Sequence, residues 1–141
     1  MMFVTAFLGV LNFKTGEFLF SNAGHHPPLI IRSGQKPEWL QLPDGFLLGV
    51  MADAIYRTER VLLNPGDKIL LYTDGVTEAM NRDKIAYSNK RLMSIVEESK
   101  SDSGEAIIRE VIQSIKEFTG DDPYSDDVTL LTVHLKGRRG V

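Results

Sequence analysis

The hydrophobic pattern of the chain changes once, near Asp74, and this change limits the folds that are open to it. Before Asp74, apolar residues alternate with polar ones or form short runs that end at Gly and Pro, as in β-strands. After it, two segments repeat apolar residues every three or four positions, as amphipathic helices do, and a final strand-like run follows. Because strands and helices are segregated along the chain, we predict an α+β fold with helices packed on the outer face of antiparallel sheet.

Turn and capping residues indicate where the expected strands and helices begin and end. Lys14-Thr15-Gly16 separates the two strands of a hairpin, and Asn64-Pro65-Gly66-Asp67 precedes a later strand. Ser88 is expected to cap the first helix, and Gly120 to end the second in αL geometry. The expected strands are 3–13, 17–21, 29–32, 39–42, 56–63, 68–71 and 128–135, and the expected helices begin at 88 and span 103–119.

The composition narrows the class of protein. The chain has 141 residues, 43% hydrophobic and 25% charged, which is the size and character of one compact domain. The net charge is −3 and the basic residues are scattered, so we expect no nucleic-acid partner. The longest apolar stretch, residues 1–11, is shorter than the roughly 20 residues that cross a membrane, so we expect no membrane span. The absence of cysteine fits a reducing compartment and predicts a cytoplasmic protein.

Acidic residues stand beside two of the expected strands. Asp74 follows the apolar run 68–71, and Asp126 and Asp127 precede the run 128–133. If these strands are neighbours, the carboxylates come together, and hard cations such as Mg²⁺ and Mn²⁺ bind carboxylate oxygens. Each motif alone is a weak signal, because Asp-Gly is common in turns and acidic residues at strand ends are usually solvated. Asp74 and Asp126 are the candidate metal ligands.

An ordered series of short motifs makes this interpretation more specific. The series consists of Phe3-Val4-Thr5-Ala6-Phe7-Leu8-Gly9, Asn22-Ala23-Gly24-His25-His26-Pro27, Leu47-Leu48-Gly49, Pro65-Gly66-Asp67, Tyr72-Thr73-Asp74-Gly75-Val76-Thr77-Glu78-Ala79 and Ser125-Asp126-Asp127-Val128-Thr129. It resembles the metal-dependent protein serine/threonine phosphatases (PPM, protein phosphatase 2C-like), in the bacterial branch of the stage II sporulation protein E and the stress-response sigma-factor regulators. The resemblance covers the chain up to about Leu135.

The resemblance implies a fold, a site and a reaction. The fold would be an antiparallel β-sandwich with helices outside, in αββα layers. Asp74 and Asp126 match the family's metal-binding aspartates, and Asp127, on the other face of the strand, would support the site without binding the metal directly. In a complete domain, two Mn²⁺ or Mg²⁺ ions would lower the pKa of a shared water that attacks phosphoserine or phosphothreonine. The partner would be a phosphorylated regulatory protein such as an anti-sigma-factor antagonist.

The chain departs from the family pattern in two places. The family's opening Asp-x-Ser/Thr-Gly-His-Gly segment, whose aspartate bridges the metals, is absent. We therefore interpret residues 1–136 as the carboxy-terminal portion of an incomplete phosphatase domain and 137–141 as a frayed tail. The missing half of the domain or an upstream sensor domain would be further partners. Alone, the chain should bind metal poorly and turn over little or no substrate. Ser88 stands where the family often has glycine, which should affect only a loop.

Other polar residues admit two interpretations. His25 and His26 could act at the site, but a strand-to-strand turn is favoured because His26 precedes proline. Glu78 could orient a metal-bound water, or it could place negative charge in the first turn of a short helix over 76–80, where the helix dipole favours it. Arg91 has no partner evident from the sequence and is expected on a solvated face.

Two functions are compatible with these observations. The chain is part of a Mn²⁺/Mg²⁺ phosphatase, or it is a truncated, inactive interaction module of the same fold that binds the same kind of partner or its own missing half. An isolated β-sandwich binding protein is a third interpretation, which the ordered spacing of the motifs disfavours. An added Asp-x-Ser-Gly segment would separate the first two, because only a divided catalytic site would gain activity.

Overall fold

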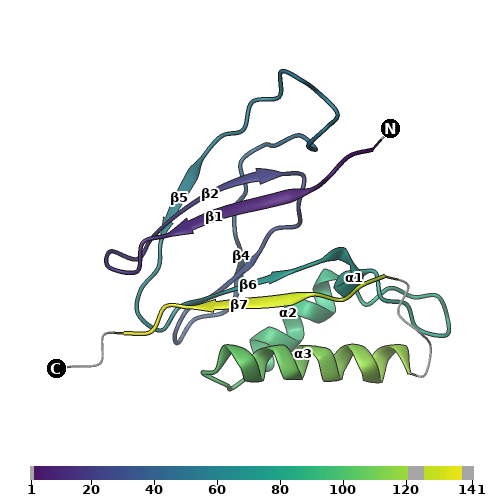
Figure 1. Ribbon diagram of the computed structural model, residues 1–141. Helices are drawn as coiled ribbons and strands as arrows, with labels where there is room; N and C mark the ends of the chain where they lie inside the picture. The colour runs from purple at the N-terminus through teal and green to yellow at the C-terminus, as the bar shows by residue number, and fades with distance from the viewer. Residues whose placement is uncertain (1, 121–125, 138–141) are drawn as a thin grey trace.

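The computed structural model describes residues 2–120 and 126–137 and has the expected α+β organisation (Figure 1). None of the helices within these residues is long and apolar enough to cross a membrane. The strands are β1 Ala6–Leu11, β2 Glu17–Ala23, β3 Leu29–Ile31, β4 Glu38–Trp39, β5 Glu59–Leu62, β6 Lys68–Tyr72 and β7 Leu130–His134, and the helices are α1 Asp74–Thr77, α2 Ser88–Glu98 and α3 Gly104–Thr119.

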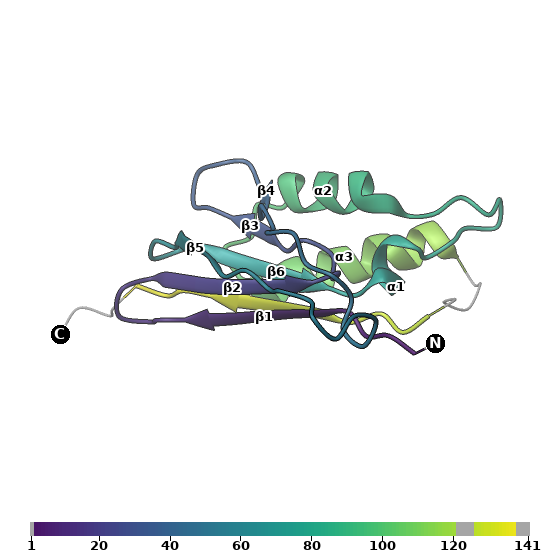
Figure 2. The ribbon, with the colours of Figure 1, turned by 90° about the horizontal axis from the view of Figure 1, so that it is seen from above.

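Two antiparallel sheets and one helical layer build the described part of the chain. Strands β1-β2-β5 form one sheet and β4-β3-β6-β7 form the other. Helices α2 and α3 lie together on the face of the four-stranded sheet that points away from the three-stranded one (Figures 1 and 2). No helix of the described residues covers the outer face of the three-stranded sheet, so three of the four expected αββα layers are present.

Strands β3 and β6 are the centre of the molecule because both of their faces are buried. Ile30 and Ile69 are opposite each other and point into the core between the sheets. Leu29 and Leu70, the next pair, point into the core beneath the helices. This double burial explains why both segments are continuous apolar runs rather than alternating ones. Between the sheets, the rings of Phe7, Phe18 and Phe20 pack with centroids 5.7–6.2 Å apart.

Asp67 fixes the beginning of β6. Its side chain is only 3% exposed. One carboxylate oxygen accepts hydrogen bonds from Arg32 Nη1 and the Asn64 backbone N–H, both at 2.9 Å. The other oxygen accepts a longer one, 3.4 Å, from the backbone N–H of Ser33. The Pro65-Gly66-Asp67 motif therefore ties the turn before β6 to the end of β3.

Replacing Asp67 by alanine should lower the free energy of unfolding by about 3 kcal/mol, because Arg32 and two backbone N–H groups lose a buried partner. Urea denaturation followed by circular dichroism measures the loss. The exposed Asp53 provides a matched control, since Asp53→Ala should change stability by less than about 0.5 kcal/mol. Equal effects of the two substitutions would contradict the anchoring role of Asp67.

Two local expectations are wrong. Ser88 is not a side-chain cap: it lies inside α2 with φ +73°, and the capping residue is Tyr87. Gly120 is the C-cap of α3 itself, with φ 66° and ψ −137°, which is not αL geometry. Arg91 is exposed, as expected, and its guanidinium also lies 4.4 Å from the centroid of the Phe118 ring and donates to backbone carbonyls.

The positive φ of Ser88 predicts that Ser88→Gly stabilises the fold by about 1 kcal/mol, because glycine adopts this conformation without the Cβ clash. The same change at the exposed, mid-helical Ser94 should destabilise by about 0.5–1 kcal/mol, because glycine there only adds backbone entropy to the unfolded chain. Thermal unfolding of the two variants tests the contrast. Destabilisation by both would show that Ser88 is unstrained.

Candidate metal centre

Asp74 stands at the end of the most buried strand. Strand β6 ends at Tyr72, and after Thr73 the exposed Asp74 opens the short helix α1. Strand β6 is antiparallel to β7, with Tyr72 opposite Leu130. The residues that follow β6 therefore lie beside those that precede β7. This register places Asp74 and the Asp126-Asp127 pair at one end of the four-stranded sheet.

Thr73 joins the two acidic segments. Its hydroxyl donates to the carbonyl oxygen of Asp127 at 3.0 Å and accepts from the backbone N–H of Thr129 at 3.1 Å. Its own N–H donates to the carbonyl of Thr129 at 3.1 Å. These three bonds continue the sheet contact past the last strand residues. The role of Thr73 is not evident from the sequence, because it depends on which strand is its neighbour.

Gly75 allows the two segments to approach each other closely. A Cβ atom at this position would lie 2.3 Å from the carbonyl oxygen of Asp127 and 2.9 Å from its carbonyl carbon. Such contacts are impossible without moving the backbone. Glycine is thus required here for close packing rather than for an unusual φ. This is the structural reason for a glycine after Asp74.

Asp126 and Asp127 lie before β7 and not in it, since the strand begins at Leu130. The expectation that Asp127 points away by strand alternation therefore has no basis here. Asp126 Oδ1 accepts the backbone N–H of Asp127 at 2.7 Å, which holds the Asp126 carboxylate against its own backbone. Both side chains are exposed, as is Asp74. This acidic end of the sheet is therefore open to solvent.

The donor set fits a hard divalent cation only in part. Carboxylate oxygens are the ligands that Mn²⁺ and Mg²⁺ prefer. The Thr73 hydrogen bonds and the close packing at Gly75 together form a clasp, which fixes the backbones that carry these carboxylates. Within residues 2–120 and 126–137, however, no group of three or more His, Asp or Glu side chains could hold a metal. A cation held by Asp74 and Asp126 would need water or further polypeptide to complete its coordination shell.

Two histidines stand at the same end of the sheet. Strand β3 is antiparallel to β6, with Leu29 opposite Leu70, so residues just before β3 lie beside residues just after β6. The ring of His26 stacks on Tyr72 at 6.0 Å. Nδ1 of His25 is 3.3 Å from the Thr5 hydroxyl. Knowledge of the strand order and its register would therefore have been enough to predict both histidines near Asp74.

Burial and the neighbouring His26 lower the pKa of His25, and a backbone hydrogen bond at Tyr72 and the charge of Asp74 oppose this shift. The imidazole is therefore neutral at pH 7. Because the folded-state pKa is below 6.5, the stability that this depression contributes is present above pH 6.5 and is lost as pH falls through the folded-state pKa. Burial also raises the pKa of Tyr72 to about 12. Its hydroxyl stays protonated and donates to Asn89 Oδ1.

Glu78 does not lie in the first turn of a helix. Helix α1 covers only Asp74–Thr77, and Glu78 is its C-cap with φ −94°. Its backbone N–H donates to the Asp74 carbonyl at 2.8 Å. The explanation by the helix dipole is therefore wrong, because a negative charge is unfavourable at the C-terminal end.

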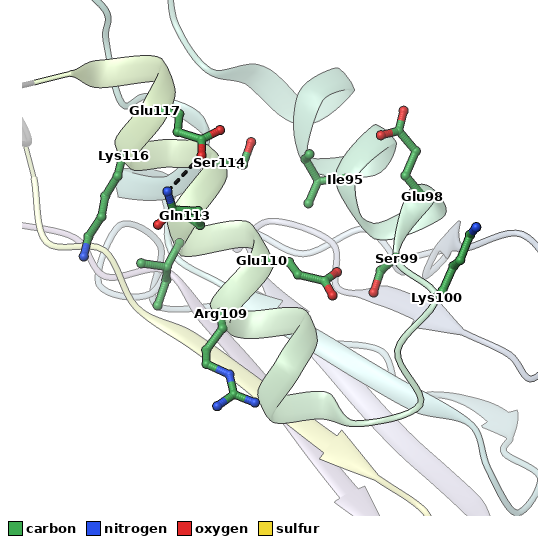
Figure 3. A pocket seen from close by; sticks show the side chains of 11 residues that line it. Ile95, Glu98, Ser99, Lys100, Arg109, Glu110, Gln113, Ser114, Lys116 and Glu117 are labelled. Carbon is green, nitrogen blue, oxygen red and sulfur yellow. Dashed lines mark hydrogen bonds between the residues drawn. The ribbon is translucent and has the colours of Figure 1, made fainter.

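A separate groove lies between α2 and α3, on the helical face (Figure 3). Ile95 and Ile112 are among the residues that line it, and Gln113, also in the lining, donates to Glu117 at 2.8 Å. Acidic and basic side chains both line it, with Glu98, Glu110, Lys100 and Lys116 among them. This mixture attracts neither anions nor cations strongly, so the groove offers no chemistry comparable to that of the acidic end of the sheet.

Comparison with known proteins places the chain in a family. The family described as stage II sporulation protein E (SpoIIE) matches residues 1–136. The chain belongs to the SpoIIE family. This match spans both sheets, the helices and the two acidic segments, so the whole described SpoIIE-type fold is covered rather than one motif.

Relatives of this SpoIIE-family chain are longer than the chain itself. It is 30% identical over 135 residues to Protein IcfG of Synechocystis, covering 94% of this chain and 21% of that protein. It is 27% identical over 135 residues to the phosphoserine phosphatase RsbU of Bacillus subtilis, covering 96% of this chain and 40% of that protein. The chain therefore spans about a fifth and two fifths of the lengths of these curated relatives.

A solved structure supports the fold assignment. The phosphatase domain of SpoIIE from Bacillus subtilis, presoaked with Mn, superposes with a TM-score of 0.77 at 15% identity, covering 97% of this chain and 59% of that one. Because the sequences are only 15% identical, this similarity is evidence for the fold and not for the function. The two sheets and the helices on the four-stranded sheet thus follow the arrangement of a protein phosphatase 2C-type domain, as expected from the sequence.

Thr73→Val keeps the shape of the side chain and removes both hydroxyl bonds, one to the carbonyl of Asp127 and one from the N–H of Thr129. We expect a loss of about 1–2 kcal/mol in unfolding free energy and at least about tenfold weaker Mn²⁺ binding. Thr129→Val is the matched control, because it makes the same chemical change at the exposed position just before β7. Titration calorimetry and urea denaturation measure the two effects. If Thr129→Val weakens Mn²⁺ binding as much, the clasp does not position the site.

Proposed function

We propose that residues 1–136 form the carboxy-terminal portion of a metal-dependent protein serine/threonine phosphatase domain. The observation that carries the proposal is the joining of Asp74 to the Asp126-Asp127 segment by the Thr73 bonds and the close approach at Gly75. Membership in the SpoIIE family and the relation to a phosphoserine phosphatase support it. The residues 137–141 that follow would be a tail; of these, 138–141 lie outside the described residues.

In this proposal Asp74 and Asp126 hold Mn²⁺ or Mg²⁺ through carboxylate oxygens, and Asp127 supports them. The Asp127 carbonyl is already held by Thr73, so its contribution is to fix the backbone next to Asp126. A complete pair of ions would supply an activated water and would offset charge on the phosphoryl oxygens. His25 stands nearby as a neutral imidazole, and neither it nor the protonated Tyr72 carries negative charge that would repel a phosphate.

The proposed substrate is a phosphoserine or phosphothreonine on a regulatory protein, such as an anti-sigma-factor antagonist. Asp74, Asp126 and Asp127 are all exposed at the end of the sheet. A phosphorylated side chain on a folded partner can reach such a site, whereas a deep pocket would favour a small molecule. The relation to RsbU supports the choice of phosphoserine.

The alternative is an interaction module of the same fold that binds a partner without turnover. It is favoured by one observation: among the described residues, no three metal-binding side chains come together. For the same reason, we expect the chain alone to hydrolyse little or no phosphoester. Both functions predict the same fold, so they must be separated by metal binding and by complementation.

Mn²⁺ titration calorimetry tests the metal site. We expect weak binding to the chain, reduced at least about tenfold in the double variant Asp74→Asn, Asp126→Asn, because two anionic ligands are lost. The variant Asp44→Asn, Asp53→Asn makes the same change in net charge at exposed positions and should bind like the parent chain. Equal affinities in all three proteins would contradict the assignment of Asp74 and Asp126.

Complementation tests the reaction. A variant carrying an amino-terminal Asp-x-Ser-Gly segment should hydrolyse a phosphoserine peptide in Mn²⁺, and activity should disappear when Asp74 or Asp126 is changed to asparagine. If the extended protein binds Mn²⁺ but stays inactive with every phosphopeptide tried, the interaction module is the better account.

A further inference from the structure

The backbone carbonyl of Tyr72 lies where strand pairing cannot supply a donor. The N–H of Thr73 donates to the segment before β7, and strand backbone groups alternate in direction, so those of Tyr72 face the β3 side. Continuing the pairing of Leu29 with Leu70 by two residues places Pro27 opposite Tyr72. Proline has no N–H. A donor for this carbonyl must therefore come from a side chain or from solvent.

The imidazole of His25 supplies this donor. Its Nδ1 lies 3.3 Å from the hydroxyl of Thr5, which stands just before β1, and the ring also forms a hydrogen bond with the backbone of Tyr72. Burial lowers the pKa of His25 most strongly, and the bond at Tyr72 opposes this, so the ring donates there and the Tyr72 carbonyl accepts. Since β1 and β6 belong to different sheets, the imidazole connects the two sheets beside Asp74.

The turn that carries His25 fixes where the imidazole starts. The Asn22 side chain accepts the backbone N–H of His25 at 3.2 Å, and Gly24 has φ +71°. A Cβ atom at Gly24 would also lie 2.3 Å from the side chain of Leu47. An Asn side chain that closes on a following N–H builds a turn of defined direction. The residues from Asn22 to His25 thus have a common purpose, which is to place one ring.

The two contacts of the ring assign its tautomer. A neutral imidazole has one N–H donor and one acceptor nitrogen. Burial and the neighbouring His26 lower the pKa of His25, so the ring is neutral at pH 7. A carbonyl oxygen can only accept, so the single N–H goes to Tyr72, and Nδ1 accepts from the Thr5 hydroxyl. The proton is therefore on Nε2, and neither nitrogen is left for a phosphoryl group or a metal.

We propose that His25 is a positioning residue for the acidic site, because its Nε2–H replaces the donor that Pro27 lacks and holds the backbone that carries Asp74 from the side opposite to Thr73. Thr73 binds the segment before β7, on one side of β6, and His25 binds on the β3 side. The backbone is thus held on both sides immediately before Asp74. This role rests on the proposed metal site, of which Asp74 is part.

Three variants at one position separate the two bonds of the imidazole. His25→Gln places an amide donor near the position of Nε2 and should keep the bond to Tyr72. His25→Asn places its amide near the position of Nδ1 and should keep only the contact with Thr5, and His25→Leu loses both. His134→Leu is the matched control, because His134 is also half-buried with a pKa lowered by burial, but lies at the other end of β7.

Hydrogen exchange measures the effect on the backbone without metal. The amides of Thr73 and Val76, which donate to the carbonyls of Thr129 and Thr73, should exchange at least about threefold faster in His25→Leu and His25→Asn, relative to the amides of α3. They should be unchanged in His25→Gln and His134→Leu. Unchanged exchange at Thr73 and Val76 in His25→Leu, or equal acceleration in α3, would overturn the proposal.

The tautomer gives a spectroscopic test that a role in packing alone would not satisfy. Long-range ¹H–¹⁵N correlation spectra of the isotope-labelled parent chain at pH 7 should show the His25 proton on Nε2 and a bare Nδ1. A proton on Nδ1 would leave no donor for the Tyr72 carbonyl and would overturn the proposal.

Mn²⁺ titration calorimetry connects the backbone to the site. We expect His25→Leu and His25→Asn to bind Mn²⁺ at least about threefold more weakly than the parent chain, and His25→Gln to bind like it. If Asp74→Asn, Asp126→Asn weakens binding but His25→Leu does not, the metal site stands and His25 does not position it. If the parent chain and the double aspartate variant bind equally, the metal site is wrong, and the positioning role falls with it.

Discussion

The pairing of β6 with its two neighbours determines the rest of the structure. This strand is buried on both faces and hydrogen-bonded to β3 on one side and β7 on the other. At its beginning, Asp67 binds Arg32 and the backbone N–H groups around it. At its end, Thr73 binds the backbone of the segment before β7. The position of Asp74 is therefore fixed by a rigid element, which is what a metal ligand requires.

The two faces of the molecule are unequal. Helices α2 and α3 bury one face of the four-stranded sheet, whereas no described helix covers the three-stranded sheet. The candidate site is also sparse, because no third metal-binding side chain joins its carboxylates among the described residues. Exposed apolar side chains such as Leu8, Val10 and Leu62 on the uncovered sheet require a partner surface or remain a cost in solubility. The uncovered sheet and the small set of carboxylates both agree with the proposal that this chain is part of a larger phosphatase domain.

The sequence predicted the kinds of elements well and their lengths less well. The apolar period gave the helices within one residue at their start, because Ser103 caps α3 by accepting from Ala106. Strands β1, β5 and β7 are shorter than their expected ranges and β2 and β6 run past theirs, because a strand continues only as far as a neighbour pairs with it. Strand β1 begins at Ala6 since its partner β2 ends at Ala23, and β5 begins at Glu59 since its partner is Phe20. Such limits depend on contacts that no local pattern contains.

At the candidate site, too, some residues can be recognised from the sequence and others only from the structure. Asp74 and Asp126 stand out in the sequence because carboxylates follow or precede apolar strands. Thr73 and Gly75, which bring their backbones together, do not stand out, since a threonine and a glycine in a turn are ordinary until the register of β6 and β7 is known. The interpretation of Glu78 failed for a related reason: α1 is a single turn, so the end of the helix came earlier than its pattern suggested.

Paramagnetic broadening by Mn²⁺ in the amide spectrum of the isotope-labelled chain is the most direct test of the central claim, that the clasped acidic segments form a cation site. Resonances of Gly75, Asp126 and Asp127 should broaden first, at Mn²⁺ concentrations that leave the α2 and α3 resonances sharp. Broadening centred instead on the acidic rim of the groove between α2 and α3, or spread evenly over the chain, would contradict the claim.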